Sequence, residues 1–322
     1  MEWGIGRERM ATVVISDTHF GLDSSTLNDP GKVDLLMQEI SEWGSACDEV
    51  VLLGDIFDFW RVRPEKAVRD ARYFLKKLAD LDLKIRYVVG NHDHHLVVQN
   101  QEDESMERMA RGDLYPVYVP SLCWSQIING LDIEMLYPTY KTCCCHRTVL
   151  FTHGHHLDGI QAFSLLVVEK LRRLSGEELL PADLEMMMTY LYEGIYRSAC
   201  IGEMVNFEDR IWKVSGLLQW FKAGIFKGQR SLPVKQQYES ILKFLRDQNL
   251  GKVDCFVYGD THRAGIYQRR GGPLAVNAGS FTREQEKGSR LETPDTYLIL
   301  NEEGLVLRQL GRTEPLYLCE LL

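Results

Sequence analysis

Five short polar clusters contain the residue types that could do chemistry in this sequence. They combine carboxylate, amide and imidazole side chains, which are ligands for divalent cations such as Mn, Fe, Co or Zn. The clusters are Asp17 and His19 in SDTH, Asp55 and Asp58 in GDIFD, Asn91, His92 and Asp93 in GNHD, His153 and His155 in THGHH, and Asp260 and His262 in GDTH. These are too many ligands for one ion. Two cations about 3.5–4 Å apart could clamp both oxygens of an in-line phosphoryl displacement.

Taken one at a time, each cluster has an ordinary structural explanation. An Asp after a strand often makes a turn or caps a helix, and an isolated His is more often a hydrogen-bonded core or surface residue. All five clusters, however, directly follow a predicted strand. In an open α/β sheet, ligands bind in the crevice beyond the carboxyl ends of the strands. We therefore predict that the clusters converge there, although about 245 residues separate the first from the last.

The elements that must position these clusters alternate in the first half of the chain. Buried strands are predicted at 12–16, 50–53 and 84–89, and helices at 33–43 and 64–81. This alternation predicts a layered α/β fold with largely parallel strand pairing. From 117 to 152, short strands follow one another directly, which predicts a second, mixed or antiparallel sheet.

Residues 159–249 differ from both flanks, because they read as helical throughout and contain no strand signal. Strand signals return after residue 254. We therefore predict one discontinuous core domain, residues 10–158 and 250–322, interrupted by a helical cap at 159–249. The expected fold class is α/β, a layered sandwich of two mixed sheets flanked by helices.

Composition argues against several classes of protein. The net charge of -9 disfavours a general basic surface, so no stable nucleic-acid partner is expected. The eight cysteines show no Cys-x-x-Cys spacing, which favours a reducing, cytoplasmic location over a zinc knuckle or a secreted protein. Residues 1–9 have no signal-peptide pattern, and no apolar stretch approaches the roughly 20 residues that span a bilayer.

The order D-x-H, G-D-x-x-D, G-N-H-D, H-G-H and G-x-x-H resembles the metallophosphoesterase, or calcineurin-like, superfamily over residues 13–160 and 254–280. The resemblance implies the calcineurin-like form of the layered sandwich and a dinuclear metal centre. It implies a first cation held by Asp17, His19, Asp55 and His262, and a second held by Asp55, Asn91 and His153. It further implies that a hydroxide bridging both cations attacks phosphorus.

The same resemblance assigns roles to the residues around the cations. His92 is expected to donate to the phosphoryl or leaving oxygen, and Asp93 to orient its ring. Asp58 is expected to steer a histidine ligand without binding a cation. His155 and Arg263, with His94, His95 and His156 nearby, either contact substrate or only pack beside the ligands.

Asp260 departs from the family pattern, which usually reads G-H-x-H. As a ligand of the second cation, Asp260 would raise the number of carboxylate ligands in the whole centre from two to three, which favours Mn, Mg or Fe. Mn is therefore the expected ion, with Fe, Mg, Co or Zn as alternatives. In the other interpretation, the second site is weak or empty and the protein is a metal-binding scaffold.

Residues 211–246 carry seven Lys or Arg against one acid, with apolar residues at helical spacing. A basic amphipathic helix of this kind could lie in a membrane interface or close over a lipid chain. Alternatively, it packs its apolar face on the core and leaves its lysines in solvent.

GDIFDFW, the long helical insertion after H-G, and THRAG resemble the UDP-2,3-diacylglucosamine diphosphatase branch. This implies cleavage of a pyrophosphate bond in a nucleotide-linked lipid, at the inner face of a membrane. That branch usually has Arg at the position of His92 and His at that of Asp260. A broad-specificity phosphodiesterase or nuclease and a non-enzymatic scaffold are the alternatives. The acidic charge argues against a nuclease, and the presence of His92 argues against a scaffold.

Overall fold

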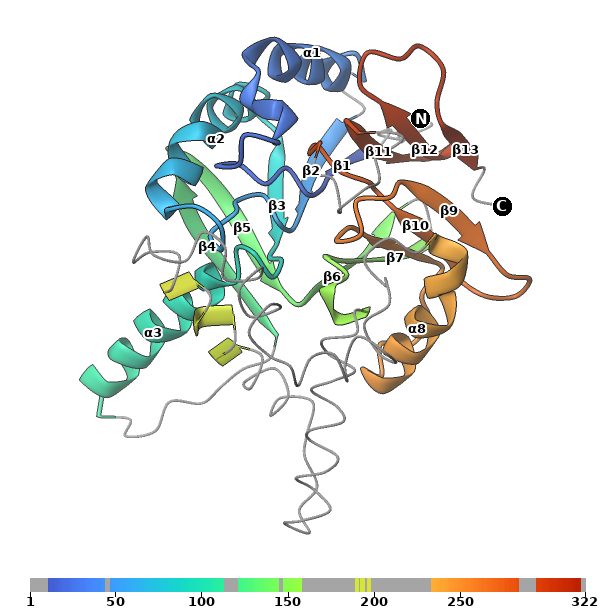
Figure 1. Ribbon diagram of the computed structural model, residues 1–322. Coiled ribbons are helices and arrows are strands. Elements are labelled where there is room, and N and C mark those ends of the chain that lie inside the picture. The colour runs from blue at the N-terminus through green and yellow to red at the C-terminus, as the bar shows by residue number, and fades with distance from the viewer. Residues whose placement is uncertain are drawn as a thin grey trace, which may run out of the picture.

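The computed structural model describes residues 11–43, 47–112, 121–144, 147–157, 189–190, 192–194, 196–197, 233–283 and 294–319. Their strands form two sheets (Figure 1). The eight-stranded sheet has the order β13-β12-β11-β1-β2-β3-β5-β4, and the five-stranded sheet the order β6-β7-β8-β10-β9.

The first sheet contains β1 (Ala11–Ile15), β2 (Cys47–Leu53), β3 (Lys84–Val88), β4 (Leu122–Ile128), β5 (Leu131–Tyr137), β11 (Thr296–Asn301), β12 (Gly304–Gln309) and β13 (Tyr317–Cys319). The second contains β6 (Thr139–Cys144), β7 (Arg147–Thr152), β8 (Cys255–Tyr258), β9 (Gly265–Gln268) and β10 (Leu274–Asn277). The helices are α1 (Pro30–Ser41), α2 (Pro64–Ala79), α3 (His95–Ala110) and α8 (Val234–Asp247), with short 3-10 turns η1 (Thr26–Asn28) and η3 (His155–Leu157).

The two sheets pack face to face between outer layers of helices. In β1, Val13 and Ile15 point to the cluster shared with α1 and α2, whereas Val14 points to the core between the sheets. In β8, Val257 points to that inner core, whereas Phe256 packs with residues of α8. The period of two along each strand thus buries both of its faces. Helices α1 and α2 lie on one outer side and α8 on the other (Figure 1).

The strand pairing confirms the predicted mixed α/β sandwich. Strands β1, β2 and β3 pair in parallel, and α1 and α2 form the crossovers between them. Strand β11 pairs antiparallel with β1, which makes the first sheet mixed. In the second sheet, β8 is parallel to both β7 and β10, whereas β6 is antiparallel to β7.

The prediction of a separate second sheet at 117–152 is wrong for half of that segment. Strands β4 and β5 join the first sheet, where β5 pairs in parallel with β3, and only β6 and β7 start the second. The alternating burial of β4 and β5 suits any sheet with one exposed face, so their pattern alone does not select the partner strand.

Helix α8 falls inside the segment predicted as a cap, yet it packs as a flanking helix of the second sheet. Its buried face contains Val234, Tyr238, Ile241 and Phe244, while Lys235 and Lys243 are exposed. For this part of the basic segment, the apolar face therefore lies on the core. Residues 211–232 and most of 159–232 lie outside the described residues, so the membrane contact and the cap boundaries stay predictions. None of the described helices is long and apolar enough to cross a membrane.

Candidate metal centre

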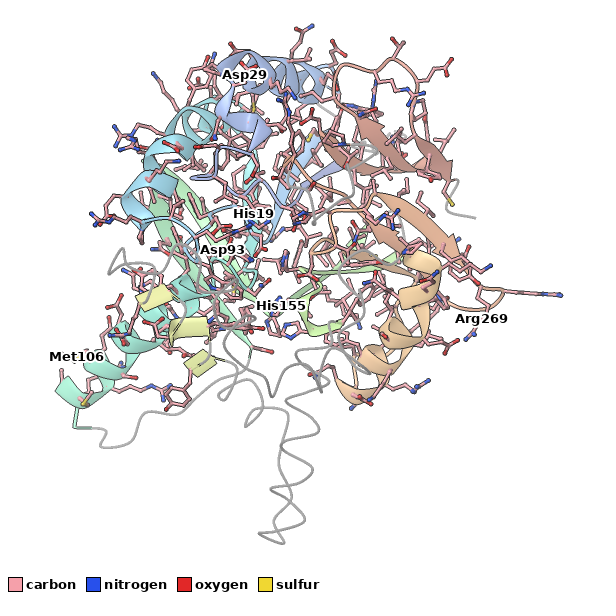
Figure 2. All side chains as sticks on the ribbon, viewed as in Figure 1. His19, Asp29, Asp93, Met106, His155 and Arg269 are labelled. Carbon is pink, nitrogen blue, oxygen red and sulfur yellow. The ribbon has the colours of Figure 1, made fainter. Side chains whose placement is uncertain are left out.

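The five clusters meet where the carboxyl ends of strands from both sheets face each other. Asp17, Asp55 and Asn91 follow β1, β2 and β3, and His153 and Asp260 follow β7 and β8. Figure 2 places His19 and Asp93, which follow strands of the first sheet, near His155, which follows a strand of the second, in the middle of the molecule. The predicted convergence is therefore what the structure shows.

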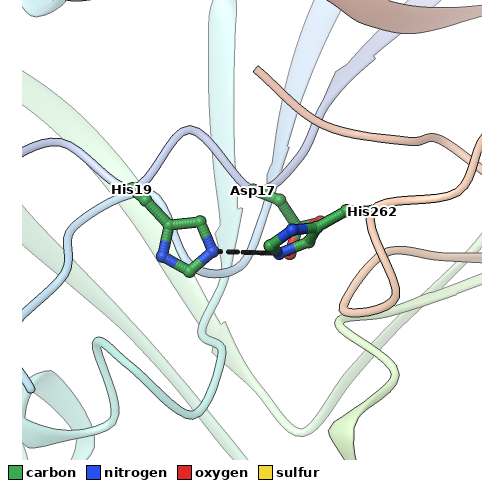
Figure 3. Close-up of side chains that lie close together, drawn as sticks. All are labelled: Asp17, His19 and His262. Atoms are coloured by element: carbon green, nitrogen blue, oxygen red, sulfur yellow. Dashed lines mark hydrogen bonds and ion pairs between the residues drawn. The ribbon is translucent and has the colours of Figure 1, made fainter. Parts of the chain in front are cut away.

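Asp17, His19 and His262 form one group of candidate ligands (Figure 3). The Nε2 atoms of His19 and His262 are 3.1 Å apart, and Nε2 of His262 lies 3.3 Å from Oδ1 of Asp17. Asp17 is fully buried, and His19 is 1% exposed. Two imidazole nitrogens and a carboxylate oxygen facing one point are the donor set of a divalent cation.

Asp55 joins this group to a second one. Its Oδ2 lies 3.7 Å from Nε2 of His19, whereas its Oδ1 lies 3.3 Å from Nε2 of His153. Oδ1 of Asp260 is 3.7 Å from the same Nε2 atom. Asp55 therefore presents one oxygen to each group, as a bridging carboxylate would.

Two buried atoms in the second group show that the residues fit a cation. The side-chain oxygen of Asn91 is buried without a hydrogen-bond partner, and so is Nε2 of His153 when that ring is neutral and does not donate to Asp55. An unsatisfied buried polar atom costs about 1–3 kcal/mol. Nδ1 of His153 donates to the carbonyl oxygen of Leu53, so its Nε2 carries the lone pair when the ring is neutral. A cation bound by these atoms would remove that cost.

The backbone is strained at five candidate ligands. Positive φ angles occur at Asp17 (51°), His19 (47°), Asp55 (51°), Asp260 (65°) and His262 (57°). The left-handed region costs a residue with a side chain roughly 1–2 kcal/mol. Hydrogen bonds between the loops hold this conformation, with His19 N donating to Asp55 O at 2.9 Å. Strain concentrated at one place is typical of functional sites, where the surrounding structure imposes it.

Glycines leave room for the central carboxylates. A Cβ atom at Gly90 would lie 2.4 Å from Oδ1 of Asp55 and 2.9 Å from the His153 ring. A Cβ atom at Gly259 would lie 2.4 Å from Oδ2 of Asp17. Glycine therefore precedes Asn91 and Asp260 because the neighbouring backbone approaches the centre too closely for a side chain.

Asp58 orients two histidines with one oxygen. The Nδ1–H groups of His19 and His92 each donate to its Oδ2 at 3.0 Å, which turns both Nε2 atoms toward the centre. Arg61 donates to the same carboxylate through its backbone N–H, Nε and Nη2. Burial raises the pKa of Asp58, but the charges of Arg61 and His92 outweigh it and hold that pKa well below its usual value. The expected steering role of Asp58 agrees with this geometry.

The expectation that Asp93 orients the His92 ring needs correction, because Asp58 takes that position. The Asp93 carboxylate instead accepts the backbone N–H groups of Gly90 at 2.6 Å and Ile56 at 2.8 Å, and the hydroxyl of Tyr87. Asp93 thus braces the loop that carries Asn91 and His92. Its burial and the nearby Asp55 charge raise its pKa to about 7.

The histidines differ in how they hold protons. Burial lowers the pKa of His19 to about 4, so this ring is neutral at pH 7, as a ligand must be. Burial also lowers the pKa of His153, but the charges of Asp55 and Asp17 outweigh it and raise that pKa well above its usual value. A proton on His153 therefore neutralises the carboxylates, and a cation would take its place.

The remaining candidates lie in two environments. His155 is buried, with its ring centroid 5.6 Å from that of His153 and 3.8 Å from that of His156. Burial and the neighbouring histidines hold its pKa well below the usual value. Arg263, by contrast, is exposed beside His262.

Three residues near the site have roles that were not predicted from the sequence. Arg61 binds Asp58, Trp60 stacks on His92 with ring centroids 4.2 Å apart, and Tyr192 contacts Trp60. The run FWR directly after GDIFD contains the first two, so their proximity to the cluster is the available signal. No pattern in the sequence connects Tyr192 with them.

The match to a protein family agrees with this geometry. The model of the calcineurin-like phosphoesterase family matches residues 10–264. Similar solved structures include a dimetal phosphatase from Danio rerio, with 18% identity, a TM-score of 0.42, and 95% of this chain and 98% of that chain covered. Another is GAP50, the anchor in the inner membrane complex of Plasmodium, with 12% identity, a TM-score of 0.42, and 97% of this chain and 88% of that chain covered. A third is Vps29 from Chaetomium thermophilum, with 11% identity, a TM-score of 0.39, and 93% of this chain and 86% of that chain covered.

No protein with a curated description matches the chain. The family match nevertheless covers well over half of the sequence and runs from the start of β1 past His262, so that it includes all five clusters. The chain therefore belongs to the calcineurin-like phosphoesterase family.

Proposed function

We propose that this protein is a hydrolase of phosphoester or pyrophosphate bonds that works with two divalent cations. One observation carries the proposal: Asp55 directs one oxygen toward His19 and the other toward His153. Asp17, His19, Asp55 and His262 would hold one cation, and Asp55, Asn91, His153 and Asp260 the other. When bound, the cations would polarise a phosphoryl oxygen and lower the pKa of a water molecule.

His92 is the residue that could protonate the leaving oxygen. Asp58 binds its Nδ1, and its Nε2 lies 3.9 Å from Oδ2 of Asp55, at the edge of the centre. Burial lowers the pKa of His92, but the charges of Asp58 and Asp55 outweigh this effect and raise it. The raised pKa keeps the ring protonated to higher pH, as a general acid requires.

We propose Mn as the preferred ion and a nucleotide-linked lipid such as UDP-2,3-diacylglucosamine as the substrate. The third carboxylate, Asp260, supports a cation that prefers oxygen ligands. The motif resemblance supports the lipid substrate, and the part of the basic segment before α8, residues 211–232, would then contact a membrane surface at the cytoplasmic face. A broad-specificity phosphodiesterase is the second candidate, because the same centre would serve it.

A substrate and metal panel tests the proposal. Bis-p-nitrophenyl phosphate, a UDP-linked lipid and a DNA oligomer would each be assayed with Mn, Mg, Fe, Co and Zn. We expect hydrolysis that requires added metal, is lost with Asp55→Ala, and is fastest for the UDP-linked lipid with Mn. Mass spectrometry should count two cations per chain. Two bound cations without hydrolysis of any substrate would instead identify a scaffold.

A further inference from the structure

A row of three rings begins at the candidate acid, His92. The ring of Trp60 stacks on His92, with centroids 4.2 Å apart and an interplanar angle of 25°. Tyr192 lies next in the row, with its ring centroid 5.5 Å from that of Trp60. Tyr192 also contacts the rings of His94, at 5.0 Å, and His155, at 5.9 Å. It comes from the segment predicted as a cap, a hundred positions beyond His92 in the sequence.

The neighbours of Tyr192 hold it in this place. Glu193 forms an ion pair with His95, the first residue of α3, at 2.8 Å from its Nδ1. The ring of Tyr196 stacks on His95 with centroids 3.5 Å apart and planes 10° from parallel. Arg197 donates to the other oxygen of Glu193 at 2.8 Å. These contacts tie the segment to α3, which starts three residues after His92.

Burial determines how these rings can act. Trp60 and Tyr192 are each 6% exposed, so neither offers a face to a substrate. The hydrogen bond to Asp58 fixes one edge of the His92 ring, but small changes in the two side-chain torsions of His92 would still tilt the opposite edge. Trp60 lies against its face and blocks that tilt, and Tyr192 in turn packs against Trp60.

We propose that Tyr192 is a positioning residue, which keeps Trp60 against His92 and so holds the acid in line with the leaving oxygen. The inference rests on the proposed function. It makes Tyr192 part of the reaction machinery, in addition to any role that it has in specificity. A small misplacement of a reacting group can lower a rate by about a hundredfold.

Leaving-group dependence distinguishes positioning from a general structural role. Bis-p-nitrophenyl phosphate and diphenyl phosphate have similar shapes, but only the second needs a proton on its departing oxygen. We expect Tyr192→Leu to lower kcat for diphenyl phosphate by about tenfold or more, since general acids contribute about 10²–10⁴-fold. For bis-p-nitrophenyl phosphate, the loss should stay below about threefold, with KM unchanged for both substrates.

Two variants complete the test. Tyr192→Phe keeps the ring and should restore both rates. Tyr190→Leu makes the same change in the same segment at a residue that is 74% exposed, and should leave both rates unchanged. The metal content of every variant should remain that of the unsubstituted protein.

Equal losses on both esters in Tyr192→Leu, or loss of metal, would overturn the positioning role and leave the proposed function intact. Retention of the diphenyl phosphate rate in Tyr192→Leu would also overturn it. Failure of the unsubstituted protein to hydrolyse either ester with any cation would overturn the proposed function, and the positioning role with it.

Discussion

Replacing Asp58 with asparagine tests whether one carboxylate organises both histidines. Its Oδ2 accepts a hydrogen bond from His19 and another from His92, each at 3.0 Å, in a fully buried position. Asparagine keeps the shape and removes the charge. A hydrogen bond to a charged group contributes about 1.5–3 kcal/mol and a neutral one about 0.5–1.5 kcal/mol, so each bond should lose about 1–1.5 kcal/mol.

The two losses should appear in different measurements. The His92 bond acts on the proton donor, so kcat for diphenyl phosphate at saturating Mn should fall about tenfold, since about 1.4 kcal/mol corresponds to that factor. The His19 bond acts on a candidate ligand, so calorimetric titration should show Mn binding weakened by about tenfold or more. Both values refer to Asp58→Asn compared with the unsubstituted protein.

The pH profile provides a third readout. The Asp58 charge is one of the two that raise the pKa of His92 against the effect of burial, so the ring stays protonated to higher pH. Without that charge the pKa should fall, and the alkaline limb of kcat should move to lower pH. Asp34→Asn, at an exposed residue of α1, is the control that should leave the limb in place. An unmoved limb together with kcat within about twofold would refute the role of Asp58.

Substitutions at three further positions test other parts of the centre. Asp260→Ala should leave one cation per chain, whereas Asp260→His should keep two, because an imidazole can bind a cation as a carboxylate does. Two cations in Asp260→Ala, counted by mass spectrometry, would exclude the ligand role. Gly90→Ala should weaken Mn binding in calorimetry, since its Cβ would lie 2.4 Å from Oδ1 of Asp55 and overpacking costs about 1–3 kcal/mol; unchanged affinity would contradict this. Asp93→Ala should lower the free energy of unfolding of the metal-free protein by about 3 kcal/mol or more, because three buried donors lose their acceptor. Denaturant titration measures this free energy. A loss below about 1 kcal/mol would show that Asp93 does not brace the loop.

Much of the fold is predictable because its signals are local. Strands β1, β2 and β3 are short, largely apolar runs, and the structure places them within three residues of the predicted ends. Helix α3 was not predicted, because only Leu96, Val97 and Val98 are buried in it and it therefore lacks a continuous apolar face. The sheet that the β4–β5 hairpin joins was not predicted either, because the alternating pattern of the hairpin suits both sheets.

For the candidate site, too, some features are predictable from the sequence and others are not. The sequence by itself determines the set of carboxylate, amide and imidazole groups and places them directly after strands, because motif spacing and strand periodicity are properties of neighbouring residues. Parallel pairing then brings the strand ends to one edge.

Only the tertiary structure decides which of these groups contact one another. It assigns the His92 ring to Asp58 and not to Asp93, and it brings Tyr192 to Trp60. Both choices depend on loop conformations, including the left-handed backbone at Asp55, that residues distant in the sequence impose. Contacts of this kind arise from the packing of loops against each other, which no local pattern encodes.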